Sequence, residues 1–391
     1  PTAPKPYLPK LTAAMERNLM HHIPKPPLTQ IPQDLVSLAD YAHYAKAHMR
    51  PDIYEYISGG TGDEVTLQNN QNAFQRWQII PRMLQDVTGA GTQVNLFGQT
   101  FRHPVLLAPV AFHKLVHEQG ELATAEAVNA LEASMCVSTL SSVDMETLGS
   151  TLTQPKIFQL YLQASRDFSL ELVRRAERAG YCAIMVTVDA SLHGIRNRAQ
   201  RAGFVLPEVI RAENLIDRPE LPTASFTPDQ SIILQGMMSE APTWADIEWL
   251  VSQTDLPVII KGLLHPEDVK QAEAMGAKGV VVSNHGGRVL DQVPSALDML
   301  PEIRATVSDD FMLLLDGGVS RGTDVLIAMA LGANALMIGR PQLNALAVAG
   351  ALGVAHMLRV LREEFEVALA LAGVTDLSDI RQVALRRVQR T

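Results

Sequence analysis

The chain has 391 residues, of which 47% are hydrophobic and 19% are charged. This composition is typical of a folded globular protein and excludes a disordered or collagen-like chain. The formal net charge of −9 at pH 7 lacks the excess of Lys and Arg that binding to nucleic acid or anionic lipid requires, so no nucleic-acid partner is expected.

The two cysteines, Cys136 and Cys182, each lie inside an apolar run. This setting predicts buried thiols rather than metal ligands or a disulfide, and it fits a reducing, cytoplasmic compartment; no metal site is predicted. The longest uncharged stretches, 325–339 and 341–358, contain polar residues or glycine and are separated by Arg340. With no signal-peptide layout at the N-terminus, neither a membrane span nor a leader is expected.

The N-terminal region is rich in proline. Eight of the 23 prolines fall within residues 1–32, a density that prevents regular helix and predicts an extended arm over residues 1–33, laid on a surface or on a partner subunit. The folded domain is expected to span residues 34–391. It begins with a helix predicted over 35–57, with Asp34 as N-cap, that ends at Ser58-Gly59-Gly60.

Beyond residue 100, one pattern recurs: a short apolar run, a polar turn and an amphipathic stretch that ends in Gly. Helices are predicted over 119–133, 167–179, 265–275 and 322–331. The eight predicted strands are 105–108, 135–139, 157–161, 183–188, 258–261, 279–283, 312–316 and 335–339.

These strands are apolar without alternation, which is typical of parallel strands buried on both faces. Eight successive βα units favour a closed (β/α)8 TIM barrel over the alternative, an open doubly wound sheet. The stretch 205–242 between the fourth and fifth strands is too long for a simple crossover loop, and it predicts a mobile lid.

In a barrel, the functional face is the one at which the strands end. Polar residues follow nearly every predicted strand. In chain order they are Ser138, Thr139, Gln159, Tyr161, Thr187, Asp189, Lys261, Ser283, Asn284, His285, Asp316 and Arg340. Any one of them could be a turn or cap residue, but their accumulation at one level of the barrel predicts a site.

The segment SNHGGR places His285 and Arg288 three residues apart after the sixth strand. A histidine that titrates near neutral pH can act as a base, and a guanidinium matches a carboxylate, so this segment predicts a base beside an anion clamp. The alternative is a glycine turn with a surface arginine.

Glycines and cations also follow the seventh and eighth strands, in DGGVSRG (316–322) and in Gly339-Arg340-Pro341. This is where barrels commonly bind phosphate, and the two motifs together predict a phosphorylated cofactor.

From about Asp40 to about Gly373, the chain resembles the FMN-dependent α-hydroxy-acid oxidase and dehydrogenase family, which includes glycolate oxidase, lactate oxidase and flavocytochrome lactate dehydrogenases. The motifs that carry the resemblance are SNHGGRVLDQVPSALDMLPEI, LLLDGGVSRGTDVLIAMALGANALMIGRP, FQLY, TVDASLHGIRNR and LAPVAFHKLVHEQGE. It implies an FMN held in the barrel mouth and the oxidation of an L-2-hydroxy acid, such as lactate, to a 2-oxo acid.

The resemblance also implies roles for individual residues. His285 matches the active-site base, and Asp189 matches the carboxylate that orients it. Arg288 and Arg196 match the pair that grips the substrate carboxylate. Tyr56 and Tyr161 match tyrosines that help this pair, and in relatives the hydroxyl at the position of Tyr161 faces the substrate. Lys261 matches the cation near the flavin N1–C2=O edge. The flavin ring and ribityl contacts would come from Pro109, Val110, Ala111, Ser138, Gln159, Thr187 and Ser283, and the phosphate contacts from Asp316, Gly318, Arg321, Gly339 and Arg340.

Two positions depart from the family pattern. Relatives usually carry two basic residues after DGGV, whereas here the first is Ser320 and only Arg321 remains, which predicts weaker phosphate binding unless Arg321 or Arg340 compensates. Leu140 stands where glycolate oxidases have Trp, which predicts a roomier pocket for substrates larger than glycolate.

Three functions remain open from the sequence. The leading one is a flavin oxidoreductase whose flavin is reoxidised by oxygen, a quinone or a carrier protein, in a homo-oligomer that the resemblance predicts to be a tetramer. The second is a flavin-binding barrel without redox turnover that acts as a binding subunit. The third is a non-flavin aldolase with Lys261 as the Schiff-base amine.

Overall fold

In the computed structural model, which describes residues 23–219, 227 and 229–388, eight parallel strands form a closed barrel. Its strands are β4 (Val105–Leu107), β5 (Ser134–Ser138), β6 (Ile157–Leu160), β7 (Ala183–Thr187), β8 (Val258–Leu263), β9 (Gly279–Val282), β10 (Met312–Asp316) and β11 (Ala335–Ile338). They pair in chain order, and β11 closes against β4. The predicted TIM barrel is confirmed, and the open sheet is excluded.

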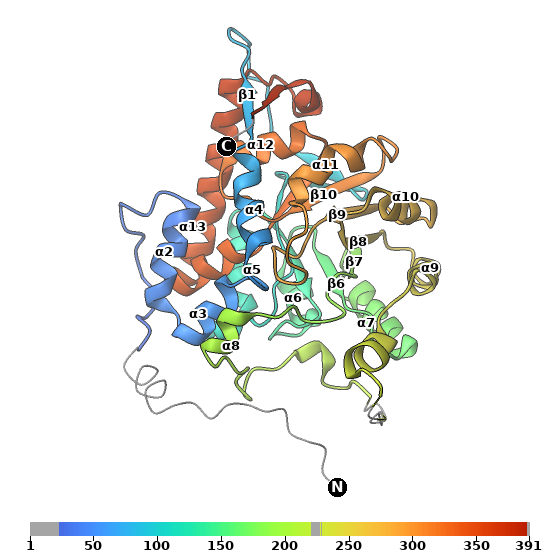
Figure 1. The fold of residues 1–391 in the computed structure, drawn as a ribbon. Coiled ribbons are helices and arrows are strands. Elements are labelled where there is room, and N and C mark those ends of the chain that lie inside the picture. Colours follow the sequence, from blue (N-terminus) through green and yellow to red (C-terminus); the bar gives the residue numbers. More distant parts are fainter. Residues whose placement is uncertain (1–22, 220–226, 228, 389–391) are drawn as a thin grey trace.

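Helices surround the barrel (Figure 1). They are α5 (Glu121–Ala130), α6 (Met145–Thr151), α7 (Arg166–Arg178), α9 (Trp244–Gln253), α10 (Pro266–Ala274), α11 (Ala296–Arg304), α12 (Gly322–Ala330) and α13 (Arg340–Ala372). The four helices predicted between strands are therefore confirmed as α5, α7, α10 and α12.

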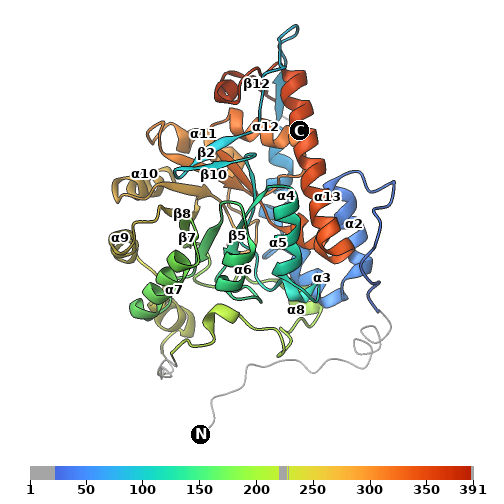
Figure 2. The ribbon, with the colours of Figure 1, turned by 180° about the vertical axis from the view of Figure 1, so that it is seen from behind.

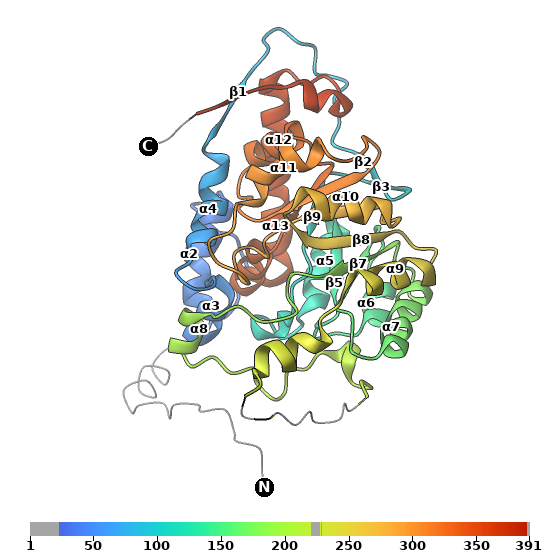
Figure 3. The same ribbon diagram turned by 45° about the vertical axis from the view of Figure 1, so that its right-hand side comes forward.

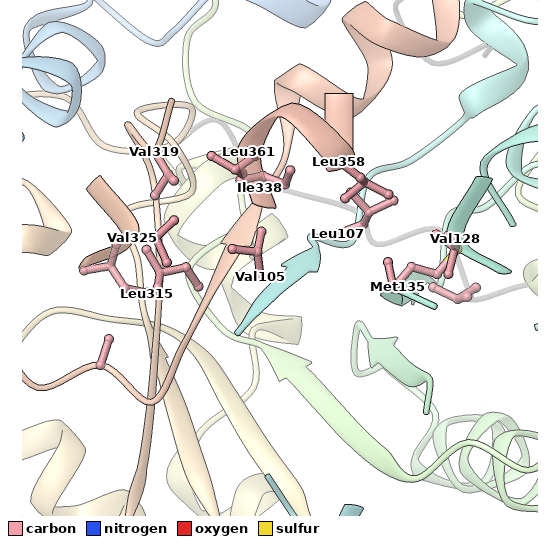
Figure 4. Packing of buried hydrophobic residues seen from close by; sticks show 14 of the residues in the cluster. Val105, Leu107, Val128, Met135, Leu315, Val319, Val325, Ile338, Leu358 and Leu361 are labelled. Carbon is pink, nitrogen blue, oxygen red and sulfur yellow. The ribbon is translucent and has the colours of Figure 1, made fainter. Parts of the chain in front are cut away.

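The core has two layers, one inside the barrel and one between the strands and the helices. Cys136, Met185 and Leu314 belong to the interior layer, whereas Cys182 is only partly buried. Figure 4 shows part of the outer layer, where Leu107 and Ile338 lie beside Leu358 and Leu361 of α13. Strands that meet a layer on each face are buried along their whole length, which explains their uninterrupted apolar runs.

A hairpin covers the amino-terminal end of the barrel. Its strands β2 (Val94–Leu96) and β3 (Gln99–Phe101) pair with each other, and Leu96 and Phe101 are buried with the interior layer. A second small sheet joins β1 (Trp77–Ile80) to β12 (Ala384–Arg387), near the carboxyl end of the described chain (Figure 3). The hairpin leaves the carboxyl-terminal end of the barrel as the accessible mouth.

The helix predicted over 35–57 is wrong in one respect, because the structure has two helices, α2 (Leu38–His48) and α3 (Pro51–Ser58). Pro51 explains the break, since it has no N–H and it disfavours helical backbone in the residue before it. The N-cap of α2 is Ser37 rather than Asp34, whose carboxylate accepts a hydrogen bond from Tyr44 instead. The predicted end at Ser58 is confirmed.

Helix α13 runs along the barrel beside α2 and bends at Ala349 and Gly350, whose backbone angles are not helical (Figure 2). Its length and composition would allow it to cross a membrane, but 67% of its most apolar window is buried inside the fold, as in a core helix. The described part of the Pro-rich arm lies along both helices: Lys25 N donates to Ala47 O, and Leu28 N donates to Val348 O. Residues 1–22 of the predicted arm lie outside the described residues.

The predicted lid, 205–242, is a long excursion at the barrel mouth, and part of it lies outside the described residues. Its described part contains the short turns η2 (Glu213–Leu215), η3 (Ile232–Gly236) and η4 (Met237–Glu240). Its mobility stays a prediction.

Candidate active site

His285 and Asp189 form a partly buried pair at the barrel mouth. Asp189 follows β7, His285 follows β9, and His285 Nδ1 lies 2.9 Å from Asp189 Oδ1. The pair depends on Gly262, where β8 has an irregularity: a Cβ there would lie 2.6 Å from the Cβ of Asp189, and the backbone φ is +108°. A glycine is therefore required beneath the Asp189 side chain.

Burial and the positive charge of Lys261 lower the pKa of His285, although Asp189 opposes them. Burial raises the pKa of Asp189, but the charge of Lys261 and the hydrogen bond from His285 outweigh it, and the net shift is downward. The aspartate is thus ionised and can only accept, so Nδ1 carries the proton. His285 is neutral near pH 7, which leaves its Nε2 as a proton acceptor.

Lys261, in the second half of β8, forms a buried network with residues of the next two strands. Its Nζ donates to Ser283 Oγ at 3.0 Å and lies 2.9 Å from Asp316 Oδ2. Ser283 Oγ in turn donates to Asp316 Oδ1 at 2.6 Å. Burial alone would lower the pKa of Lys261, but Asp316 and Asp189 raise it well above its ordinary value. Lys261 is therefore an ammonium, unsuited to the neutral-amine chemistry of a Schiff-base aldolase.

Two arginines flank the ring of Tyr56. Tyr56 lies on α3, and Arg196 immediately precedes α8 (Asn197–Arg201), which lies beside α3 in Figures 1 and 3. The guanidinium carbons of Arg196 and Arg288 lie 5.4 Å and 5.3 Å from the ring centroid. Burial and the charges of Arg196 and Arg340 lower the pKa of Arg288. This crowding of cations favours an anionic ligand between them.

A row of polar side chains crosses the ends of β5, β6 and β7. Ser138 Oγ donates to Gln159 Oε1 at 3.1 Å, and Gln159 Nε2 donates to Thr187 Oγ1 at 3.1 Å. Tyr161 follows the same edge, and burial raises its pKa to about 12, so its phenol stays protonated. The residues after β4, Pro109, Val110 and Ala111, are half-buried beside this row.

The predicted phosphate residues do not all come together. The half-buried guanidinium of Arg340 donates to the carbonyls of Ile57, Gly59 and Gly286. Arg321 instead forms an ion pair of 2.7 Å with Glu364 on α13, and its side chain is half exposed. If Arg321 is to compensate for Ser320 at the phosphate, its side chain must therefore first leave Glu364.

The glycines of this region differ in how much space surrounds them. A Cβ on Gly339 would meet nothing closer than 4.0 Å, so the backbone there is open to a ligand. Gly318 (φ +87°) packs directly against the backbone of Asn70, and a side chain there would overlap Asn70. Gly318 is therefore explained by its packing against α4 (Val65–Phe74).

The mouth fits the FMN that the resemblance implies. Within the described part of the chain, two buried polar atoms there, Asp189 Oδ2 and Arg196 Nε, have no hydrogen-bond partner. The same mouth contains the ammonium of Lys261, the amide of Gln159 and several hydroxyls, which together suit the polar edge of an isoalloxazine ring. Gly339 and Arg340 would bind the phosphate.

Sequence reasoning missed two residues that shape this site. Phe204 stacks on Tyr56 with ring centroids 4.0 Å apart and an angle of 11° between the planes. Asn70 on α4 pairs with Asn284, next to His285. Neither lies at a strand end, and no local motif marks them.

Known proteins resemble this chain in sequence and in fold. The family model described as FMN-dependent dehydrogenase matches residues 45–387. An L-lactate oxidase from Alicycliphilus denitrificans is 46% identical over 354 residues, covering 90% of this chain and 97% of the relative. Glycolate oxidase 3 from Arabidopsis thaliana is 38% identical and covers 90% and 96%. A crystal structure of mandelate oxidase with (S)-2-phenylpropionate superposes with a TM-score of 0.83 at 40% identity, covering 91% and 99%.

Proposed function

The chain belongs to the FMN-dependent dehydrogenase family, and from this membership we propose that His285 and its neighbours at the barrel mouth carry out the oxidation of an L-2-hydroxy acid to the 2-oxo acid. The protein is thus an FMN-dependent oxidoreductase acting on 2-hydroxy acids, as the resemblance predicted. The observation that carries the residue assignment is the His285–Asp189 pair beside the buried Lys261.

His285 is the base. Its Nε2 takes a proton from the substrate, and Asp189 stabilises the imidazolium that forms while holding the ring in one orientation. FMN, when bound, would supply the two-electron acceptor: it would take up the electron pair and one of the two hydrogens that the substrate loses, and His285 takes the other as a proton. The positive charge of Lys261 would favour the anionic form of the reduced flavin at the N1–C2=O edge.

Arg288 and Arg196 bind the substrate carboxylate, and Tyr56 and Tyr161 assist them. A planar guanidinium presents two N–H groups to a carboxylate in one fork, which fixes the direction of the substrate Cα relative to the base. Support for this assignment comes from the two cations that flank one tyrosine ring.

The flavin ring and ribityl chain would be held by Pro109, Val110, Ala111, Ser138, Gln159, Thr187 and Ser283. Gly339 and Arg340 would bind the phosphate, with Asp316 and Gly318 shaping the adjacent loop. Arg321 would join them only by leaving Glu364, so we assign the phosphate chiefly to Arg340 and to backbone N–H groups.

We propose a lactate-like substrate larger than glycolate, because Leu140 stands at the sequence position where glycolate oxidases carry the bulkier Trp. The similarity to L-lactate oxidases from Alicycliphilus denitrificans and Nostoc supports this choice. The same relatives support oxygen as the acceptor. We further propose a cytoplasmic homotetramer, which light scattering of the purified protein tests.

The test mixes purified protein with L-lactate, glycolate, L-mandelate and longer 2-hydroxy acids, first without and then with oxygen, while flavin absorbance is followed. We expect L-lactate to bleach the flavin and oxygen to restore it. His285→Asn should keep FMN bound and slow bleaching by about 10²–10⁴-fold, the usual contribution of a general base. Near-normal bleaching in this variant would refute the base assignment. A yellow protein that no hydroxy acid bleaches would instead favour a binding subunit.

A further inference from the structure

Helix α4 lies outside the ring of catalytic side chains, yet it is joined to the turn that carries His285. We infer that Asn70 of α4 is a positioning residue, which holds His285 in register with Asp189 through the side chain of Asn284. This inference rests on the role proposed above for His285.

The two asparagines form a reciprocal pair. Asn70 Nδ2 donates to Asn284 Oδ1 at 2.8 Å, and Asn284 Nδ2 donates to Asn70 Oδ1 at 2.8 Å. Both side chains are buried, with exposed fractions of 2% and 5%. A pair of this kind resists rotation of either amide, because each rotation would break both bonds in a place where water cannot replace them.

Backbone groups fix which way the pair points. Asn284 Oδ1 also accepts from Gly287 N at 3.1 Å, and Asn284 Nδ2 also donates to Pro294 O at 3.0 Å. Since an N–H can only donate and a carbonyl can only accept, these two contacts determine the orientation of the Asn284 amide. That orientation then determines the orientation of Asn70. All the hydrogen-bonding capacity of the Asn284 amide is used.

The turn needs such support because its backbone is strained. His285 has φ +56°, followed by Gly286 at +62° and Gly287 at +71°. A non-glycine residue in this region persists only where its surroundings hold it there. Relaxation of His285 to negative φ would turn its Cα–Cβ bond and move its imidazole away from Asp189. The hydrogen bond between the two residues would then be lost.

The same loop is fastened to α4 a second time, at the start of the helix. The N-cap of α4, Glu64, makes no capping bond of its own. Asp291, six residues beyond His285, supplies the cap: its carboxylate accepts from Asp63 N at 2.9 Å and from Thr66 N at 2.8 Å. Helix α4 and the loop that carries His285 are therefore joined at two places, the start of the helix and Asn70 in its middle, and the Asn70 contact is made to the residue directly before His285.

The experiment compares Asn70→Ala with Asn72→Ala, an exposed asparagine on the same helix. Both holoenzymes are mixed anaerobically with saturating L-lactate, and the rate of flavin reduction is measured across pH. We expect Asn70→Ala to slow reduction on the order of 10- to 100-fold, as a displacement of about 1 Å does to a catalytic group, with a displaced pH profile. Substrate binding, read from the concentration dependence, should stay within about threefold, and Asn72→Ala should match the wild type.

A double variant separates positioning from mere packing. If Asn70 acts through Asn284, the Asn70→Ala, Asn284→Ala double variant should be no slower than Asn284→Ala alone. Rate losses that multiply would overturn the inference, and so would a wild-type rate and pH profile in FMN-loaded Asn70→Ala, even at a lower melting temperature. Should Asn70→Ala fail to fold, Asn70→Ser is held to the same criteria. His285→Asn in the same assay tests the proposed role of His285 as the base. If flavin is reduced at the wild-type rate in this variant as well, the proposed function is wrong, and not only the role of Asn70.

Discussion

Asp189→Asn tests the electrostatic core of the site, because it removes a charge while keeping the shape. In the wild type, Asp189 Oδ1 lies 2.9 Å from His285 Nδ1. Hydrogen bonds to charged groups contribute about 1.5–3 kcal/mol, so loss of the charge should slow flavin reduction by about 10- to 150-fold. The loss falls on the transition state, where the imidazolium is forming and the carboxylate stabilises it most.

The pH dependence gives this variant a second signature. Asp189 raises the pKa of His285 against the lowering effects of burial and Lys261. Removing the carboxylate therefore lowers that pKa further. Since the base must be neutral to accept a proton, activity is lost as pH falls through the pKa of His285, and the acidic limb of the rate profile should move to lower pH in Asp189→Asn.

The assay is anaerobic stopped-flow reduction of bound flavin by L-lactate between about pH 5 and 8, the range in which histidine titrates. The expected result is a lower plateau with an acidic limb displaced to lower pH. A limb displaced to higher pH would refute the electrostatic account, and an unchanged plateau would show that Asp189 does not stabilise the transition state.

Three further predictions concern neighbouring parts of the mouth. Arg288→Lys should weaken binding of the 2-oxo acid product, measured from flavin absorbance changes, by about tenfold or more, because a point charge cannot replace a planar fork; equal affinity would remove Arg288 from the clamp. Ser320→Arg should tighten FMN binding to the apoprotein by about one to two decades, the value of one charged hydrogen bond, whereas an unchanged dissociation constant would show that Arg321 or Arg340 already compensates. Gly262→Ala should displace Asp189, whose Cβ would lie 2.6 Å from the new methyl group, and largely abolish flavin reduction; a rate near wild type would contradict the requirement for glycine there.

The eight barrel strands were predictable because a parallel strand buried on both faces leaves an unbroken apolar run in the sequence. All eight occur within two residues of their predicted bounds. The N-terminal helix was less well predicted, since the helical spacing of the apolar residues Ala45, Met49 and Ile53 continues across the break before Pro51 and hides it. The proline was the signal for that break, and it outweighs the periodicity because it removes a donor and constrains its predecessor.

The site was predictable to the extent that strand ends converge. The network of Lys261, Ser283 and Asp316 follows from strand order alone, since β8, β9 and β10 are neighbours. Arg321 shows the limit of this reasoning: it is the N-cap residue of α12, but its guanidinium pairs with Glu364. Phe204 and Asn70 are distant in sequence from Tyr56 and Asn284, the residues they contact. Their contribution to the site becomes visible only in the folded structure.

The arrangement of charge at the mouth explains why an acid, rather than an ester, is expected to be the substrate. Burial lowers the pKa of Arg288, and the positive charges of Arg196 and Arg340 lower it further. Partial compensation comes from α3, since its last carbonyls accept hydrogen bonds from Arg288 and Arg340, and the end of a helix carries partial negative charge. Because the partial negative charge at the end of α3 is less than one full charge, the arginine cluster keeps a net positive charge before the substrate binds. A substrate carboxylate that enters the mouth is stabilised by this charge. Esters of 2-hydroxy acids lack the carboxylate's negative charge, and we expect them to reduce the flavin far more slowly than the free acids at equal concentration; comparable rates would mean that the guanidinium cluster serves the cofactor alone.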